Sequence, residues 1–480
     1  MTLSNSIIKK ILLILWVIII LTINSKYQDF FQNSLSLITI FNYARYFLPI
    51  ILFPLIFYLI LRKINKIKID LFLILLILFG CIQLISFIYN INLNFYNLHF
   101  ESNIINLNYE TWNFENIILL SKYFYLILLF ILFQSYSCDY KKIFFILFII
   151  ISIVTIFYFS ILLKEFIFNE SVFYFYGNKE LLADSNNSFV MQTNPRVTGL
   201  GRNLVIIFSV LFFIYNDLII KKTAIFKTLF LFLIFLSTFL IWGTQSRGSL
   251  VCFSVIIIMF ILFDKKNIKY KILFFFVIFL FPILLFESIS ELKYEKYKSK
   301  YKLDNHSINN NYSRILNKNT LPHFIDNDPH FIDNEANYDY STGRTTIWKR
   351  SFNFIYKKPW IGYGPQGDRV ALSNNKEKSL AEQKHIWDNN SSNAFIYTLL
   401  SAGIFGLICL TGIYLLIIKK IINLLFKSNI FHSNNYLLKI NISIIAMLLF
   451  RSTFENGFVF FGIDLIFLIT CFYYLKNNHS

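Results

Sequence analysis

Residues 71–90 read LFLILLILFGCIQLISFIYN, a run of 20 residues that contains no charged side chain. A helix of about 20 residues is as long as the hydrocarbon core of a bilayer is thick, about 30 Å. Similar runs recur along the chain, in which hydrophobic residues make up 56% of the 480 residues and charged residues 15%. The composition therefore predicts an all-α polytopic membrane protein.

We expect about twelve transmembrane helices, each roughly 16 to 25 residues long. The first run is not followed by the small residues of a cleavage site, so we expect it to remain in the membrane. The predicted spans cover approximately 6–23, 47–61, 71–90, 117–134, 143–163, 203–220, 228–243, 249–263, 272–287, 393–417, 436–453 and 457–475.

Charge in the short loops predicts the orientation of these spans, because Lys and Arg mark the cytoplasmic side. The basic connections are RKINKIK, SYSCDYKK, KKTAIFK, DKKNIKYK and KKIINLLFK, and they alternate with less basic ones. We therefore expect both termini in the cytoplasm and a large outer loop, 288–392, between spans nine and ten. The same loops account for most of the formal net charge of +18, so nucleic-acid binding is not expected.

The spans and loops divide the chain into three predicted parts. Residues 1–202 hold spans one to five and end in the outer loop 164–202, residues 203–417 include the loop 288–392, and residues 418–480 hold the last spans. The large loop is off-centre and no convincing repeat relates the two halves, which disfavours a transporter. The five cysteines fall in spans or, for Cys138, in a cytoplasmic loop, and their spacing fits no metal site.

The outer loop contains a basic stretch with several Gly and Pro residues, STGRTTIWKRSFNFIYKKPWIGYGPQGD, at residues 341–368. Its apolar and basic residues separate onto two faces of a helix that Pro359 would end. The pattern predicts an amphipathic helix on the outer membrane surface with its apolar face toward the lipid. The neighbouring repeat HFIDNDPHFIDNE, at 323–335, fits no calcium loop, and we interpret it as a solvated surface segment.

Arginines near the outer ends of spans are the candidate binding residues. Arg344 stands in the first turn of the amphipathic helix, where a cation opposes the macrodipole unless an anion binds there. The alternative is an ordinary exposed arginine. Arg247 lies between glycines in GTQSRGS at a membrane edge, where a charge usually has a partner or reaches toward lipid phosphates.

Two further pairs of charged residues are candidates for substrate binding. Arg196 and Arg202 lie at the mouth of span six. Arg451 and Glu455 lie at the outer end of span eleven, and the alternative for them is a simple ion pair with each other.

Four pieces of the chain, in this order, resemble the bacterial O-antigen ligase and polymerase superfamily over roughly residues 200–415. They are PRVTGLGRN before span six, SRGSLV at span eight, TGRTTIWKRSFNFIYKKPWIGYGP in the outer loop, and SNAFIYTLLSAGIFGL at span ten. The resemblance implies a metal-independent, inverting glycosyl transfer at the periplasmic face of the bacterial inner membrane, without a cofactor. The implied donor is a glycan on undecaprenyl diphosphate, and the catalytic arginines correspond to Arg247 and Arg344.

This sequence departs from the ligase pattern at one point. Ligases of the family begin span ten with a histidine–asparagine pair, and here that pair is Ser392 and Asn393. Serine cannot act as a general base at neutral pH, so His385 and Asp388 are alternative candidates for activating the acceptor hydroxyl. The other reading is that both are ordinary loop residues. Asn393 stays a catalytic candidate and Ser392 a substrate-binding candidate.

The residues and the resemblance together favour a polymerase of lipid-linked repeat units of O-antigen or another surface polysaccharide. The alternative is a ligase that transfers the glycan to lipid A core or to a protein, and a flippase or transporter is a third hypothesis. The expected partners are the lipid-linked donor, a glycan or lipid A core acceptor, the bilayer and a chain-length regulator.

The predicted topology can be tested by accessibility labelling of single tags. Tags at positions 310 and 374 should be labelled from the periplasm, and tags at 66 and 267 only from the cytoplasm. Cytoplasmic labelling at position 310 would contradict a substrate site on the outer face.

Overall fold

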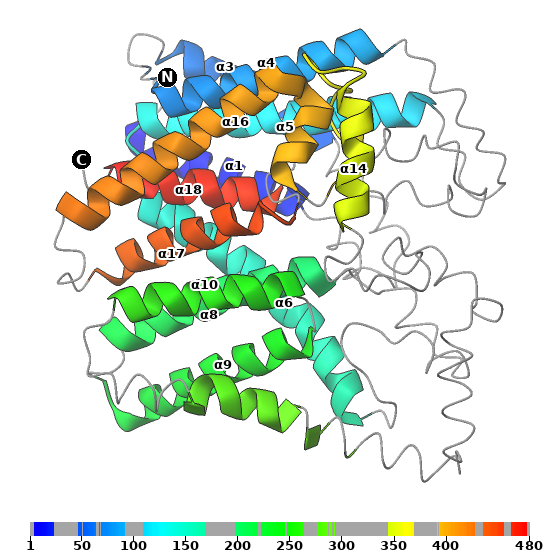
Figure 1. Ribbon diagram of the computed structural model, residues 1–480. Coiled ribbons are helices and arrows are strands. Elements are labelled where there is room, and N and C mark those ends of the chain that lie inside the picture. The colour runs from blue at the N-terminus through cyan, green and yellow to red at the C-terminus, as the bar shows by residue number, and fades with distance from the viewer. Residues whose placement is uncertain are drawn as a thin grey trace, which may run out of the picture. The chain divides into compact units, whose positions relative to one another are not determined.

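The computed structural model (Figure 1) is all-helical wherever it describes the chain. It describes residues 4–23, 47–91 without 50, 64–66 and 68, 109–168, 197–218, 222–244, 247–263, 276–292 without 287, 290 and 291, 344–368, 391, 393–427, 435–455 and 462–477. Every regular element in these ranges is an α-helix or a short π-helical turn. The predicted all-α class is confirmed for this part of the chain.

The helices follow the predicted spans closely. They are α1 Asn5–Ile23, α3 Phe53–Leu61, α4 Leu71–Asn90, α5 Tyr109–Ser135, α6 Tyr140–Phe168, α8 Val197–Asp217, α9 Ala224–Gly243, α10 Arg247–Phe263, η5 Phe276–Leu280, α14 Arg344–Ile355, α16 Ala394–Lys427, α17 Tyr436–Arg451 and α18 Ile463–Asn477.

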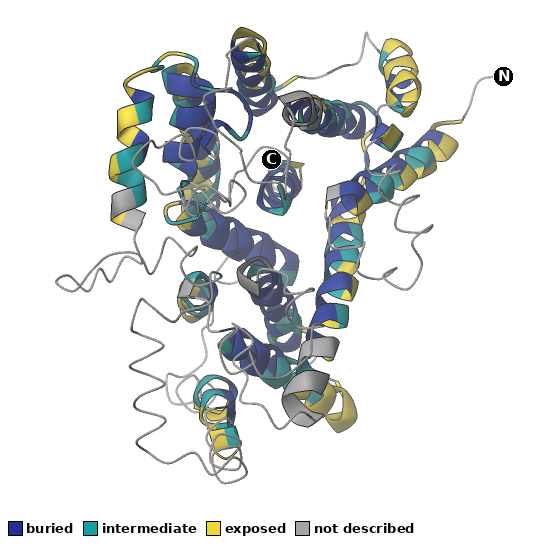
Figure 2. Cartoon of the chain, turned by 90° about the vertical axis from the view of Figure 1, so that its right-hand side faces the viewer, coloured by how far each residue is buried: buried dark blue, intermediate teal, exposed yellow. Residues whose placement is uncertain are grey.

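Seven of the described helices are long and apolar enough to cross a bilayer: α1, α4, α5, α6, α8, α9 and α16. Shorter apolar helices at 47–61, 248–263 and 276–286 coincide with three more predicted spans. The chain is thus a multi-pass membrane protein, while the total of about twelve spans and the sidedness of the loops stay predictions. Large apolar side chains such as Ile85 on α4 and Ile408 on α16 are exposed, and helices with a buried side and an exposed side are visible in Figure 2.

The chain forms two compact units that interleave along the sequence. Unit 1 comprises residues 1–143, 321–419 and 452–466, and unit 2 comprises 144–320, 420–451 and 467–480. The predicted three-part division of the chain at residues 202 and 417 stays a prediction.

In unit 1, α4 and α16 run antiparallel and side by side (Figure 1). Gln83 of α4 donates from Nε2 to Ser401 Oγ of α16 at 2.9 Å. Toward the other end of the pair, a Cβ on Gly412 of α16 would lie 2.9 Å from Leu75 Cδ1 of α4. The end of α4 and the beginning of α16 therefore lie at the same end of the unit, as the predicted orientation requires, and we call this its outer end.

Helix α16 is interrupted at Gly403, whose φ of 62° and ψ of −160° are not helical. In a continuous helix each carbonyl accepts from the amide four residues later. Here Leu400 O accepts from Tyr363 N at 2.7 Å, and Ser401 O accepts from Gly364 N at 2.9 Å. The turn after α14 therefore supplies amides that α16 itself cannot.

The two amides released by the interruption also find partners in that turn. Ile404 N donates to Pro359 O at 2.8 Å, and Phe405 N donates to Trp360 O at 3.5 Å. Four hydrogen bonds thus connect α16 to residues 359–364, and the broken backbone is satisfied within a membrane-spanning segment.

Helix α14 crosses the outer end of unit 1 (Figure 1) and packs on protein through its apolar face. Ile355 forms a buried cluster with Ile396 and Leu400 of α16, and Trp348 and Phe354 pack against that cluster. The expectation that this face lies on lipid is therefore wrong for these residues, because α16 covers it. Phe352, another apolar residue of the helix, is 44% exposed.

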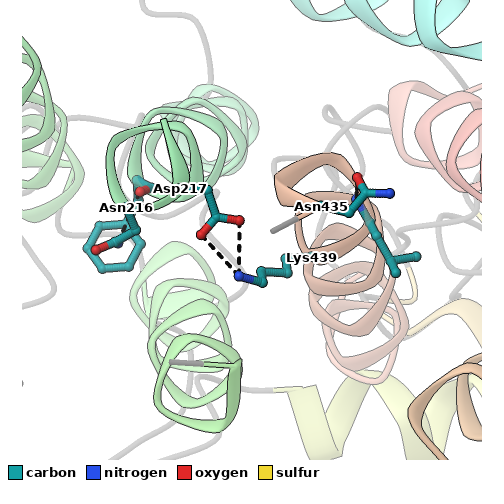
Figure 3. Close-up of polar contacts among 6 residues, drawn as sticks. Asn216, Asp217, Asn435 and Lys439 are labelled. Carbon is teal, nitrogen blue, oxygen red and sulfur yellow. Dashed lines mark hydrogen bonds and ion pairs between the residues drawn. The ribbon is translucent and has the colours of Figure 1, made fainter. Parts of the chain in front are cut away.

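In unit 2, α8 and α17 are held together by an ion pair. Lys439 Nζ donates to both carboxylate oxygens of Asp217 at 3.0 Å, and both side chains are about 10% exposed (Figure 3). Asp217 is the last residue of α8 and Lys439 lies in the first turn of α17. The two helices are therefore antiparallel, and the start of α8 lies at the same end of the unit as the end of α17.

Gly403→Ala should destabilise the protein strongly, while Gly412→Ala should not. A Cβ at Gly403 would lie 2.2 Å from both the carbonyl carbon and the oxygen of Trp360, and the positive φ alone costs about 1–3 kcal/mol for a non-glycine residue. At Gly412 the new Cβ meets only the flexible end of Leu75. Thermal unfolding of the two purified variants checks this, and equal unfolding temperatures would contradict the hydrogen-bond exchange at the break.

Candidate functional site

Three arginines lie at one end of unit 2. Ring pairs Phe208–Phe253 at 4.6 Å and Phe212–Phe260 at 4.4 Å show that α8 and α10 run parallel. Because α17 runs opposite to both, the starts of α8 and α10 lie at the same end as the end of α17. The arginines at that end are Arg202 in the second turn of α8, Arg247 as the first residue of α10 and Arg451 as the last residue of α17.

A close contact between two glycine-rich segments brings Arg202 and Arg247 to neighbouring positions. A Cβ on Gly201 would lie 2.2 Å from Ser249 Oγ, so no larger residue fits there without displacement. The contact explains why the pieces PRVTGLGRN and SRGSLV carry small residues beside their arginines. That this end of unit 2 faces the periplasm stays a prediction.

The starts of α8 and α10 favour an anion. Neither helix has an acidic residue in its first turn, so no side chain of these two turns neutralises the positive end of the macrodipole. Arg202 is half-buried and donates from Nε and Nη2 to Asn203 Oδ1 at 3.1 and 3.0 Å. Arg451 is only 8% exposed. The structure places Arg247 by its backbone, at the first position of α10.

The outer end of unit 1 brings the start of α14 near the start of α16. Trp348 donates from Nε1 to Ser391 O at 2.9 Å. Arg344, the first residue of α14, lies one turn earlier, about 6 Å along the helix axis from Trp348. The start of α14 and the start of α16 are therefore close in space, although about 50 residues separate them in the sequence.

Asn393 fixes the beginning of α16. Its Oδ1 accepts from the backbone amides of Phe395 and Ile396 at 2.8 and 3.0 Å, which is the geometry of a helix N-cap. Its Nδ2 donates to Thr453 O at 2.7 Å. The predicted catalytic role of Asn393 is untested, and the contacts give its amide a positioning task beside residue 392.

Several predicted site residues lie outside the part of the chain that the structure describes. Glu455 is described, as a half-buried residue in the turn after α17. It falls in unit 1 and Arg451 in unit 2, so their proposed ion pair stays a prediction. The side chains of Arg247 and Arg344 are not described, and neither are Arg196, His385, Asp388, Ser392 and the 323–335 repeat.

Two polar residues of this region were missed by the sequence analysis. Asp368, the last residue of GYGPQGD, is 1% exposed and accepts from the backbone amide of Ser391 at 3.1 Å. Lys358 is half-buried, and burial lowers its pKa, whereas burial raises the pKa of its neighbour Tyr363 to about 12. The only sequence signal for either was the unusual density of Gly and Pro around them. Across the described ranges, no three His, Cys, Asp or Glu side chains gather as metal ligands would.

Comparison with known families supports the resemblance stated above. Residues 231–411 match a family model described as O-antigen ligase. The matched region begins in α9, contains α10 and α14, and ends within α16. A comparison with curated proteins gave no match. The O-antigen ligase and polymerase superfamily is thus supported for the region that carries Arg247, Arg344 and Asn393, and with it an enzyme of glycan transfer from a lipid-linked substrate.

Proposed function

We propose that this protein polymerises undecaprenyl-diphosphate-linked oligosaccharide repeat units at the periplasmic face of the inner membrane. The observation that supports this most directly is that three arginines lie at one end of unit 2: Arg202 and Arg247 near the starts of α8 and α10, whose first turns hold no acidic residue, and Arg451 at the end of α17. Arg344, like Arg247, is the first residue of its helix, α14.

The reaction is an inverting substitution at the anomeric carbon of the donor sugar. The acceptor hydroxyl oxygen attacks this carbon from the face opposite the diphosphate and forms the new glycosidic bond. The bond from the carbon to the diphosphate oxygen breaks, its electron pair goes to that oxygen, and the hydroxyl proton passes to a base. The glycan leaves undecaprenyl diphosphate as the second product.

Arginines suit this reaction because negative charge grows on the diphosphate as the bond breaks. A guanidinium group offers two parallel N–H donors to a phosphate, and its charge does not depend on pH in the physiological range. Donors that are fixed before the reaction stabilise the transition state more than donors that must reorient. We propose, from the family resemblance alone, that Arg247 and Arg344 act on the diphosphate, and that Arg202 and Arg451 strengthen the positive field around Arg247. Arg196 and Glu455 remain candidates for contacts with the glycan.

Activation of the acceptor is the weaker requirement, because a diphosphate is a good leaving group. Ser392 replaces the histidine that the family's ligases carry, so we propose His385 or Asp388 as the proton acceptor. The cap formed by Asn393 and the bond from Trp348 to Ser391 O hold residues 391 and 393 next to α14, and the position of His385 and Asp388 stays a proposal. The absence of the histidine is the reason for preferring a polymerase.

A ligase is the second candidate, and the description of the matching family model favours it. In that case the same arginines would hold the donor, and the acceptor would be lipid A core or a protein. The two functions differ in the acceptor alone.

The test uses purified protein in nanodiscs with a lipid-linked repeat unit as the only substrate and a chelator present. We expect a ladder of longer lipid-linked chains from the unaltered protein, almost none from Arg344→Ala, and a substantial loss with Arg344→Lys because lysine lacks the bidentate fork. Lys349→Ala, which removes an exposed charge from the same helix, is the matched control and should keep full activity.

The result against polymerisation would be an absent ladder together with glycan on an added lipid A core or protein. Full activity of Arg344→Ala would show that this arginine is ordinary surface charge. Gel mobility of the lipid-linked products, with protein amount and thermal stability matched, distinguishes these outcomes.

A further inference from the structure

A second cationic position lies at the opposite end of α14. Lys358 follows the helix by three residues, and its ammonium group donates to Asn90 Oδ1 at the outer end of α4. Asn90 Nδ2 donates to Ser86 O at 2.6 Å and to Gly362 O at 3.1 Å. These two bonds fix the orientation of the amide, so that its oxygen faces the lysine.

Aromatic rings flank the ammonium group of Lys358. Its Nζ lies 5.7 Å from the ring centre of Tyr89 and 5.0 Å from that of Tyr363. Both distances fall within the range of a cation–π contact, which holds the charge without neutralising it. Tyr89 is 66% exposed, so the position is reachable from the surface of the protein.

The positive charge of Lys358 is not matched by a carboxylate among the residues that the structure describes. Its described partners are an amide oxygen and two rings. An ammonium group has three donors, and Asn90 accepts one of them. Burial lowers the pKa of Lys358, as expected for a charge held partly out of water with no anion beside it.

The protein surface around Lys358 is apolar. Ile88 on α4 is 59% exposed, and Trp360 and Phe405 are 60% and 48% exposed with their ring centres 5.9 Å apart. Exposed apolar side chains on membrane helices face lipid chains, and Trp, Tyr and Lys are typical of the headgroup level. A cation above a lipid-facing surface is suited to a lipid that carries a phosphate.

This lipid phosphate cannot be the one that Arg344 holds. Helix α14 has 12 residues and is about 18 Å long, and Arg344 and Lys358 lie at or beyond its two ends. A polymerase binds two polyprenyl-diphosphate-linked substrates at once, a donor and an acceptor, whereas a ligase binds one such donor and an acceptor of another kind. The acceptor reacts at the sugar farthest from its own lipid, so its diphosphate must lie at a distance from the donor's.

We propose that Lys358, with Tyr89 and Tyr363, binds the diphosphate of the lipid-linked acceptor. This inference rests on the proposed polymerase function and extends it, because it assigns the second lipid a place. The donor diphosphate lies at the start of α14, and the acceptor repeat unit runs along α14 toward it. The substrate class at this subsite is a polyprenyl diphosphate.

The first test compares Lys358→Gln with Lys357→Gln in the purified protein in phosphatidylcholine nanodiscs. A glutamine amide at 358 can still donate to Asn90, and Lys357 is an exposed lysine one residue away. With the lipid-linked acceptor, Lys358→Gln should raise KM about tenfold, the effect of losing one charge-assisted hydrogen bond. With the same repeat unit on a neutral alkyl chain, KM should not change, and Lys357→Gln should behave like the unaltered protein. Equal losses with both acceptors, or no loss with either, would overturn the assignment.

The second test measures binding without catalysis, using undecaprenyl diphosphate alone and native mass spectrometry. The unaltered protein and Lys357→Gln should bind two molecules, and Lys358→Gln one, while Lys358→Arg should retain two. Displacement of the second molecule by phosphatidylglycerol would identify a general phospholipid site and overturn the proposal. A protein that binds two molecules but makes no ladder would reject the polymerase function while keeping the phosphate site.

Discussion

The exchange of backbone hydrogen bonds between α16 and the turn 359–364 is the interaction on which the rest of unit 1 depends. A peptide group inside a bilayer has no water to bond, so a helix can break there only if other protein groups replace the lost bonds. Tyr363 and Gly364 donate to α16, and Pro359 and Trp360 accept from it. The turn therefore cannot move away from α16 without leaving four groups unsatisfied, and it fixes the end of α14.

This constraint positions the chemistry of the site. The last turn of α14 is held on α16, and its apolar face packs on Ile396 and Leu400, so the helix lies across the outer end of unit 1. Its first residue, Arg344, is thereby carried to the vicinity of Ser391 and Asn393. In unit 2 a different contact positions arginines at helix starts. The tight Gly201–Ser249 contact places the starts of α8 and α10 side by side. The helices α8, α10 and α14 each bear an arginine near the start and hold no acidic residue in the first turn.

Much of this fold was predictable from hydrophobicity and loop charge. The span 71–90 was predicted to the residue, because it is uninterrupted and bounded by Asp70, whose side chain caps α4. The predicted span 393–417 begins where α16 begins, but α16 continues to Lys427. Residues with long basic side chains beyond the membrane still favour a helix. The arginines were identified as candidates because charge at a membrane edge is costly.

The remaining features depend on tertiary contacts that a single sequence does not reveal. The sequence LLSAGIFGL predicts an unbroken helix. The segment that replaces the backbone hydrogen bonds lost at the interruption lies about 40 residues earlier. The apolar face of α14 could equally have faced lipid, and α16 was the surface that covered it. Lys358 and Asn90 meet only because the turn carries the lysine to the end of α4.

The proposed role of the arginines at the helix ends is to hold the donor diphosphate without a metal ion. The equilibrium affinity of the purified protein for an undecaprenyl-diphosphate-linked donor, measured with EDTA and then with excess Mg²⁺, tests this role. We expect the same Kd in both conditions for the unaltered protein and a Kd at least about tenfold higher for Arg247→Ala, because a charge-assisted phosphate contact is lost. A Kd that tightens strongly with Mg²⁺, or that is unchanged in Arg247→Ala, would contradict it.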